Sequence, residues 1–199
     1  MSEKRDPYHH GQLRAELLKA GLALLDGEGV DAVTVRAVAR SAGVAHSAPA
    51  NHFKDRRALL TGLAVEIFRG RAEAAERIFS EGAESPKERI KLFARDWLAS
   101  GLAFPHRYRL IWRRDCLDPQ NTILNAEMDR IYDPLVALFS EAGGQVHVSP
   151  QSQAIALWSL LHGYLSMRLN GNLVEGLDEI TGRPREDAIL ESWLTSQNI

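Results

Sequence analysis

Apolar residues recur at helical spacing along most of the chain, and no segment sustains the alternation typical of a strand. Leucines share one face between residues 13 and 26, and the GEG string at residues 27–29 is expected to end that helix. A long helix is expected from Asp55, its N-cap, to about Phe79. Five more helices are expected near residues 86–103, 105–116, 119–142, 150–170 and 185–197, most with a proline near the start. The pattern predicts an all-α fold.

The stretch from Thr34 to Leu60 predicts a helix-turn-helix, which is two short helices joined by a tight turn. Thr34 is a good N-cap, and Val35, Val38 and Ala39 make one apolar face after it. Gly43 suits the left-handed turn, and the second helix is expected from about residue 45 to 51. An ordinary helical hairpin buried in a core has the same spacing, so the spacing alone leaves both interpretations open.

The expected second helix carries short side chains, which suit a helix whose backbone must come close to base edges in a DNA groove. Its best candidates for reading bases are His46, Ser47 and Asn51, and Asn can pair with adenine through two hydrogen bonds. Phosphate contacts position a protein without reading sequence. The candidates for that role are Thr34, His52, Lys54 and Arg56.

Several collinear strings in this region resemble the N-terminal DNA-binding domain of TetR-family transcriptional regulators. They are YHHG at residues 8–11, LRAELLKAGLALLDGEG, TVRAVARSAGVAHSAPANHF and RRALL, and they cover roughly residues 8–62. The resemblance adds Tyr8 as a candidate phosphate contact. At Ala50 the family usually has a tyrosine that touches a phosphate, and at Arg56 it usually has a lysine.

Residues 154–169 are apolar nearly all the way round, which predicts that this helix is covered on every side and forms a subunit interface. The spacing of Trp158, His162 and Gly163 resembles a C-terminal domain type of some TetR-like regulators, named for those three residues. Pro134 is expected to kink or divide its helix, which can open space for a ligand.

By this resemblance the C-terminal helices hold a small-molecule pocket. Its candidate lining residues are Trp97, Tyr108, Trp112, Tyr132, Trp158 and His162. Core packing is the alternative for each aromatic residue. For His162 the commoner alternative is a hydrogen bond to a backbone carbonyl inside the core.

Charge adds little to the case for a nucleic-acid partner, because the net charge is −2. Residues 1–60 hold nine Lys and Arg against seven Asp and Glu, whereas residues 61–199 hold fifteen against nineteen. A mildly basic first part has the right sign for DNA contact. The single cysteine, Cys116, and the lack of an apolar run of membrane length predict a cytoplasmic protein with no membrane partner.

Enzyme signatures are missing from the sequence, which has no GxSxG, P-loop, HExxH or paired CxxC. The nearest approach to a metal site is the set His106, Asp115, Cys116 and Asp118, whose spacing fits no standard site. Asp118 is better explained as an N-cap before Pro119. We therefore expect no metal, no cofactor and no enzyme activity.

These observations predict a DNA-binding helix-turn-helix domain at residues 1–55 and a helical ligand-binding and dimerisation domain at residues 56–199. The expected protein is a homodimer through its C-terminal helices that binds a near-palindromic double-stranded operator. By resemblance it is a repressor that an unknown small-molecule effector releases. The main alternative is a helical enzyme or small-molecule carrier in which the helix-turn-helix is only structural. A third is an architectural DNA-binding protein without an inducer.

Overall fold

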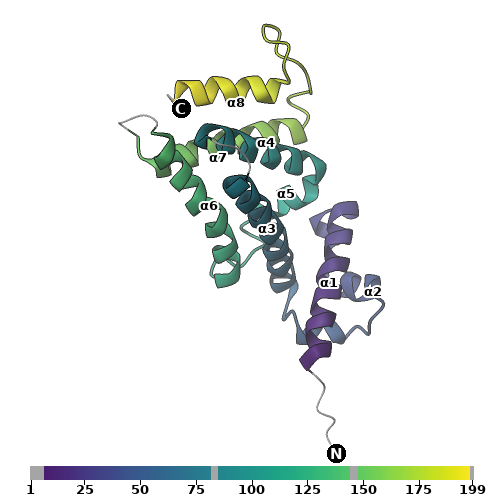
Figure 1. The fold of residues 1–199 in the computed structure, drawn as a ribbon. Coiled ribbons are helices and arrows are strands. Elements are labelled where there is room, and N and C mark those ends of the chain that lie inside the picture. The colour runs from purple at the N-terminus through teal and green to yellow at the C-terminus, as the bar shows by residue number, and fades with distance from the viewer. Residues whose placement is uncertain (1–6, 82–84, 144–147, 198–199) are drawn as a thin grey trace, which may run out of the picture. The chain divides into compact units, whose positions relative to one another are not determined.

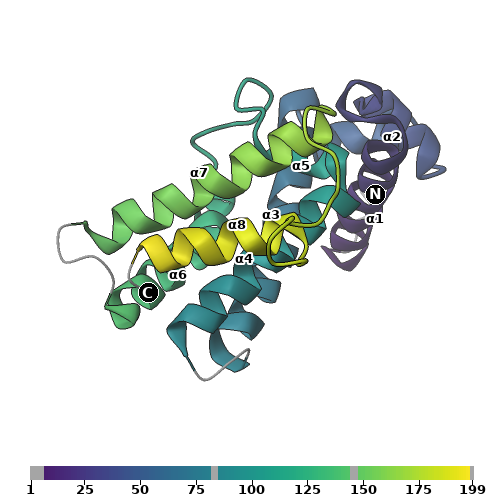
Figure 2. The same ribbon diagram turned by 90° about the horizontal axis from the view of Figure 1, so that it is seen from above.

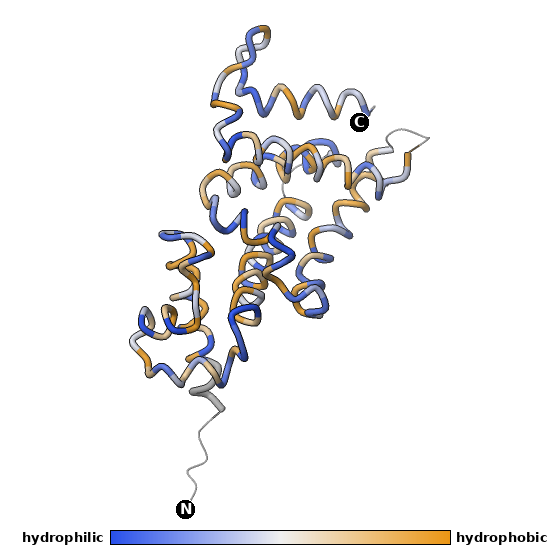
Figure 3. Tube along the Cα trace, turned by 180° about the vertical axis from the view of Figure 1, so that it is seen from behind, coloured by the Kyte–Doolittle hydropathy of each residue, from blue (hydrophilic) through white to orange (hydrophobic). Residues whose placement is uncertain are grey.

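The structure is a computed structural model that describes residues 7–81, 85–143 and 148–197, with side chains from residue 12 onward. Within these residues the chain forms eight α-helices and two short 3-10 helices, and one isolated β-bridge joins Leu177 to Pro184 (Figure 1). The prediction of an all-α fold is confirmed. Apolar and polar residues alternate along the helices with the period that led to this prediction (Figure 3).

The chain divides into two compact units, each built from two stretches of sequence. Unit 1 consists of Met1–Arg69 and Phe104–Asn125, and unit 2 consists of Gly70–Ala103 and Ala126–Ile199. The long helix α3 (Arg56–Glu81) contributes its first half to unit 1 and its second half to unit 2. Residues 104–125 therefore pack with the N-terminal part of the chain, although they are distant from it in sequence.

Unit 1 packs one long helix and four short elements with the first half of α3. These are α1 (Pro7–Glu28), the 3-10 helix η1 (Val30–Ala32), α2 (Val35–Ser41), the 3-10 helix η2 (Ala48–Asn51) and α5 (Pro105–Ile111). Helix α1 contacts both α2 and α5. The unit buries a continuous set of apolar side chains, among them Leu17, Leu25, Val38, Phe53, Leu59, Leu63 and Leu110.

Local caps and turns define the ends of these short elements. The Thr34 hydroxyl accepts a hydrogen bond from the Ala37 N–H at 3.1 Å, and the Asp55 carboxylate accepts one from the Ala58 N–H at 2.7 Å. Both N-caps were expected from the sequence. Gly43, at φ 67°, ends α2, and the Val44 N–H donates to the Ala39 carbonyl across the turn at 3.0 Å. Glycine takes this left-handed conformation without the strain that a Cβ adds.

Unit 2 is a helical bundle seen from above in Figure 2. It contains the second half of α3, α4 (Pro86–Ala103), most of α6 (Thr122–Ala142), α7 (Pro150–Leu169) and α8 (Arg185–Ser196). Helix α4 contacts both α7 and α8. Gly101 brings α4 close to α7, because a Cβ at this position would lie 2.7 Å from a methyl group of Leu165.

Three expected helices differ from those observed. The expected second helix at residues 45–51 is a single 3-10 turn over Ala48–Asn51. Pro49 has no N–H to donate to the Ala45 carbonyl, and that carbonyl accepts from the Ala48 N–H at 2.9 Å instead. The helix expected at 105–116 ends at Ile111, and the one expected at 119–142 begins at Thr122, after Asn121 caps it. Pro134 lies inside α6 without dividing it.

Candidate nucleic-acid interface

The segment after Gly43 presents one side to solvent and holds the other in the core of unit 1. Pro49 and Phe53 are buried, and the Arg14 guanidinium lies 5.6 Å from the centroid of the Phe53 ring. Residues 45–47 and 50–51 are exposed. The buried pair holds the 3-10 turn on the core, so the exposed residues 45–47 and 50–51 stand on an anchored turn.

The three predicted base-reading residues all lie on this exposed side. His46 and Ser47 come just before the 3-10 turn, and Asn51 is its last residue. The Ser47 side chain does not cap the turn. Because their neighbours are mostly alanines, the backbone can come close to a flat or grooved surface, and the three polar groups can reach hydrogen-bonding partners there.

The five predicted phosphate contacts lie in different environments. Thr34 is exposed and its hydroxyl caps α2, Lys54 is exposed, and His52 is half-buried with its Nε2 atom enclosed. The side chain of Tyr8 lies outside the described residues. For these four positions the phosphate contact stays a prediction.

Arg56, the fifth candidate, forms hydrogen bonds inside unit 1. Its Nε donates to the Val33 carbonyl at 2.8 Å and its Nη2 to the Val30 carbonyl at 2.6 Å, while Asp31 lies 3.7 Å away. The guanidinium thus satisfies one carbonyl of η1 and that of the residue after it. Its other terminal nitrogen, Nη1, can still donate to a phosphate.

Two cations that the sequence analysis did not single out are exposed on α2. Arg36 and Arg40 lie on the solvent side of this helix, which precedes the exposed turn. The sequence signal for them was their position as charged residues on either side of the apolar pair Val38 and Ala39, which is buried. They add positive charge next to the segment that carries His46 and Ser47.

The predicted ligand-pocket residues fall into both units. In unit 2, the Trp97 and Trp158 rings meet edge to face with centroids 4.3 Å apart, and Phe93 lies 5.9 Å from Trp158. In unit 1, Tyr108 and Trp112 have ring centroids 6.2 Å apart. Tyr132, on α6, is half-buried. The structure therefore forms two aromatic groups from this set.

Burial changes the ionisation of several groups near these aromatic side chains. Desolvation raises the pKa of Tyr108 and lowers the pKa of the half-buried His162. It also lowers the pKa of Arg71, whose guanidinium lies 4.8 Å from the Trp97 ring centroid and 2.7 Å from Asp96. Unit 2 thus places an aromatic cluster beside a partly exposed ion pair.

The residues considered as metal ligands have other surroundings in the structure. The His106 ring lies against Gly29, and the Arg113 guanidinium donates to both carboxylate oxygens of Asp115. Among the described residues, no group of three or more His, Cys, Asp or Glu side chains is arranged to hold a metal ion. None of the helices in this part of the chain is long and apolar enough to cross a membrane.

The fold and the exposed turn define a helix-turn-helix protein with a separate helical unit, and family models identify it further. Residues 17–63 match the model described as bacterial regulatory proteins, tetR family. Residues 90–186 match the model of the Tetracyclin repressor-like C-terminal domain. The chain belongs to the TetR family of DNA-binding transcriptional regulators. Neither model distinguishes the Trp-His-Gly domain type, which stays a prediction.

Solved structures with the same fold span the whole chain. A protein of unknown function from Rhodococcus sp. RHA1 is 28% identical and covers 96% of each chain, with a TM-score of 0.76. A TetR-family regulator from Marinobacter aquaeolei VT8 is 17% identical, covers 96% of this chain and 98% of its own, and has a TM-score of 0.70.

NalD of Pseudomonas aeruginosa also shares the fold and is described as the secondary repressor of the MexAB-OprM multidrug efflux pump. It is 18% identical and covers 94% of this chain and 97% of its own, with a TM-score of 0.63. No curated protein matches the chain in sequence.

Proposed function

We propose that this regulator is a cytoplasmic, ligand-responsive repressor and not an enzyme, and that it binds a near-palindromic operator as a homodimer. The observation that carries the proposal is the outward display of His46, Ser47 and Asn51 on a turn anchored by buried Pro49 and Phe53. In this proposal these three side chains contact base edges. Lys54, Thr34, His52, Tyr8 and the outer edge of Arg56 contact phosphates.

The homodimer is supported by one face of α7 that is exposed in the single chain. Ile155 is 56% exposed and Met167 is 46% exposed, although the opposite face buries Leu157, Leu161 and Leu165. Between them Gly163 has open space where a Cβ would stand. A helix with apolar residues on both faces is stable in water only when something covers the second face. A second copy of α7 satisfies this requirement symmetrically.

The effector site is proposed in unit 2, around Trp97, Trp158 and His162. The aromatic rings supply apolar surface, and the Arg71–Asp96 pair next to Trp97 supplies charge. An effector releases the operator only if it binds the non-binding arrangement of the protein more tightly than the binding one.

The first experiment is a fluorescence-anisotropy titration of the full chain against duplex DNA from its own upstream region. We expect Asn51→Ala to weaken binding at the preferred site by about 1–3 kcal/mol, and to relax the preference at one base position, because a bidentate contact is lost. Gln12→Ala removes a similar exposed amide on α1 and serves as the matched control.

An equal loss by Asn51→Ala on all sequences would remove Asn51 from the base-reading set. If the parent chain shows no preference for any duplex, a structural role of the helix-turn-helix in a carrier or enzyme becomes the better explanation. If it binds DNA but no small molecule from a metabolite library releases it, the architectural alternative holds.

A further inference from the structure

Residues 171–184, between α7 and α8, form an ordered hairpin that we call the α7–α8 hairpin. Leu177 and Pro184 form a β-bridge, and the Asp178 N–H donates to the Arg183 carbonyl at 2.8 Å. The Asp178 carboxylate accepts from the N–H groups of Ile180 and Thr181, at 3.2 and 2.7 Å. These bonds also hold the pKa of Asp178 below its usual range. The hairpin has its own hydrogen-bonded frame.

This frame displays apolar side chains to solvent. Val174 is 72% exposed, Leu177 is 61% exposed, and Ile180, next to the tip, is 94% exposed. Single exposed apolar residues are common on protein surfaces. Here three large apolar side chains lie within fourteen residues, and Leu173 is a further apolar residue between them and α7. Together they form a protruding apolar group that the single chain leaves uncovered.

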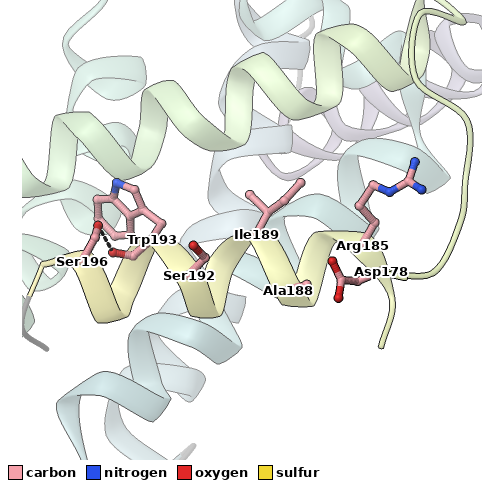
Figure 4. A pocket seen from close by; sticks show the side chains of 7 residues that line it. All are labelled: Asp178, Arg185, Ala188, Ile189, Ser192, Trp193 and Ser196. Carbon is pink, nitrogen blue, oxygen red and sulfur yellow. Dashed lines mark hydrogen bonds between the residues drawn. The ribbon is translucent and has the colours of Figure 1, made fainter. Parts of the chain in front are cut away.

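A hollow of about 480 Å³ lies along α8, beside the hairpin (Figure 4). Asp178 and Arg185 line the hairpin end, Ile189 lies in the middle, and Trp193 and Ser196 line the far end. The Trp193 ring stands edge to face against Phe139, with centroids 6.1 Å apart, so one wall of the hollow is fixed by the core. The hollow is larger than an isoleucine side chain, and its middle is apolar.

We propose that the α7–α8 hairpin of each copy crosses to the second copy and seats Ile180 in the α8 hollow there. This inference rests on the homodimer proposed above and specifies one contact between its two copies. A two-fold interface uses the same surface patch on both copies. A protruding side chain and the hollow that receives it must therefore both lie on that patch. The hairpin and the hollow satisfy this condition, because Asp178 of the hairpin also lines the hollow.

Two-fold symmetry also predicts which end of the hollow receives Ile180. When two α8 helices meet across an axis perpendicular to them, they run antiparallel. The hairpin end of one helix then faces the Trp193–Ser196 end of the other. Ile180 of one copy therefore lies beside Ser196 of its partner, while the two Ile180 side chains lie at opposite ends of the interface.

The test measures the dimer dissociation constant of the full chain by sedimentation equilibrium. We expect Ile180→Asp to raise this constant at least tenfold, because a charge would enter the apolar hollow. Ile123→Asp adds the same charge at an isoleucine that is 54% exposed on α6 in unit 1, and is expected to leave the constant unchanged. Since Ile180 is almost fully exposed, its substitution does not disturb the fold of the single chain, which circular dichroism checks.

Disulfide trapping tests the seat itself. In a Cys116→Ser background, which has no other cysteine, the double variant Ile180→Cys with Ser196→Cys is expected to give a covalent dimer on mild oxidation. Ile180→Cys alone is expected to stay non-covalent.

A parent chain that is dimeric and unaffected by Ile180→Asp would overturn the hairpin contact and leave the homodimer standing. A dimer weakened by Ile180→Asp but not trapped by the cysteine pair would overturn the seat in the hollow. A parent chain that is monomeric at micromolar concentration would overturn the homodimer, and the hairpin contact with it.

Discussion

At the scale of single residues, unit 1 depends on contacts that join distant parts of the sequence. The Arg107 guanidinium donates to both carboxylate oxygens of Asp26, at 2.8 and 2.6 Å, and lies 4.4 Å from the Phe104 ring centroid. Next to it, His106 packs so closely on Gly29 that a Cβ there would lie 3.1 Å from the imidazole Nδ1. These contacts fix α5 against the end of α1.

Asp26→Asn is expected to lower the free energy of unfolding by about 1–2 kcal/mol, because it removes a two-bond charged pair whose side chains are each only 30% exposed. Guanidinium denaturation followed by circular dichroism measures this loss. Asp115→Asn breaks an equivalent two-bond pair with Arg113 that is open to solvent, and should change stability little. Equal losses from the two variants would contradict the argument.

Side-chain hydrogen bonds to residues nearby in sequence were predictable from the sequence. Those to residues distant in sequence were not. The caps formed by Thr34 and Asp55 involve partners three residues away, so the residue type and its position identified them. Arg56 satisfies carbonyls 23 and 26 residues away, and Arg107 reaches an aspartate 81 residues away. No local pattern encodes such a partner.

At the scale of elements, the packing of α4 on α7 depends on a small residue at the crossing. Gly101 is buried, and Leu165 opposite it is fully buried, so the leucine methyl groups have little room to move. Close packing of this kind resists even one added carbon.

Gly101→Ala is expected to reduce the free energy of unfolding by about 1–2 kcal/mol, because overpacking outweighs the helix propensity gained. Gly70→Ala is the matched control, since it lies in α3 with nothing within 4 Å of a Cβ, and should raise stability by up to about 1 kcal/mol. Thermal unfolding of both variants measures the sign of each change in stability. A stabilising Gly101→Ala would show that Leu165 repacks freely.

Element types were predicted better than element ends. Periodicity identified all the long helices, because each has an apolar face and a proline or capping residue near its start. The exposed turn at residues 48–51 was expected to be a longer helix, because its alanines favour a helix and Pro49 is tolerated in a first turn. The missing N–H of Pro49 instead leaves a tighter 3-10 turn.

At the scale of the whole molecule, the proposed DNA contact combines two copies of a weakly basic surface. Its strength must come from a few placed cations, because the net charge of the chain is −2. Lys54 is the exposed cation closest in sequence to Asn51. A phosphate contact of this kind releases a condensed counterion, and so makes binding dependent on salt.

Lys54→Ala is expected to weaken binding equally on all sequences, and to reduce the slope of log K against log salt by about two, since each of two copies loses one phosphate contact. Titrations at several salt concentrations measure the slope. Arg77→Ala removes one exposed charge from the unit 2 part of α3, and should leave the slope unchanged. An unaltered slope for Lys54→Ala would remove this lysine from the interface.

The family and the fold class were recoverable from the sequence, whereas the grouping of the pocket candidates was not. Helical spacing does not show which aromatic side chains meet, so Tyr108 and Trp112 were placed with Trp97 and Trp158 as one set. The structure separates them because residues 104–125 pack with unit 1.

The single 3-10 turn has a consequence for how such a regulator finds its promoters and how it evolves. In the proposed contact, three base-reading side chains at about 1–3 kcal/mol each would give one copy about 3–9 kcal/mol of discrimination. Rejecting 10⁶–10⁹ competing genomic sites takes about 8–12 kcal/mol, so one copy falls short over most of this range, whereas two copies at about 6–18 kcal/mol would cover it. In the proposed homodimer, one codon change at His46, Ser47 or Asn51 would alter the recognition of both half-sites at once. A single mutation would therefore weaken binding to the present promoters and allow binding to a different set.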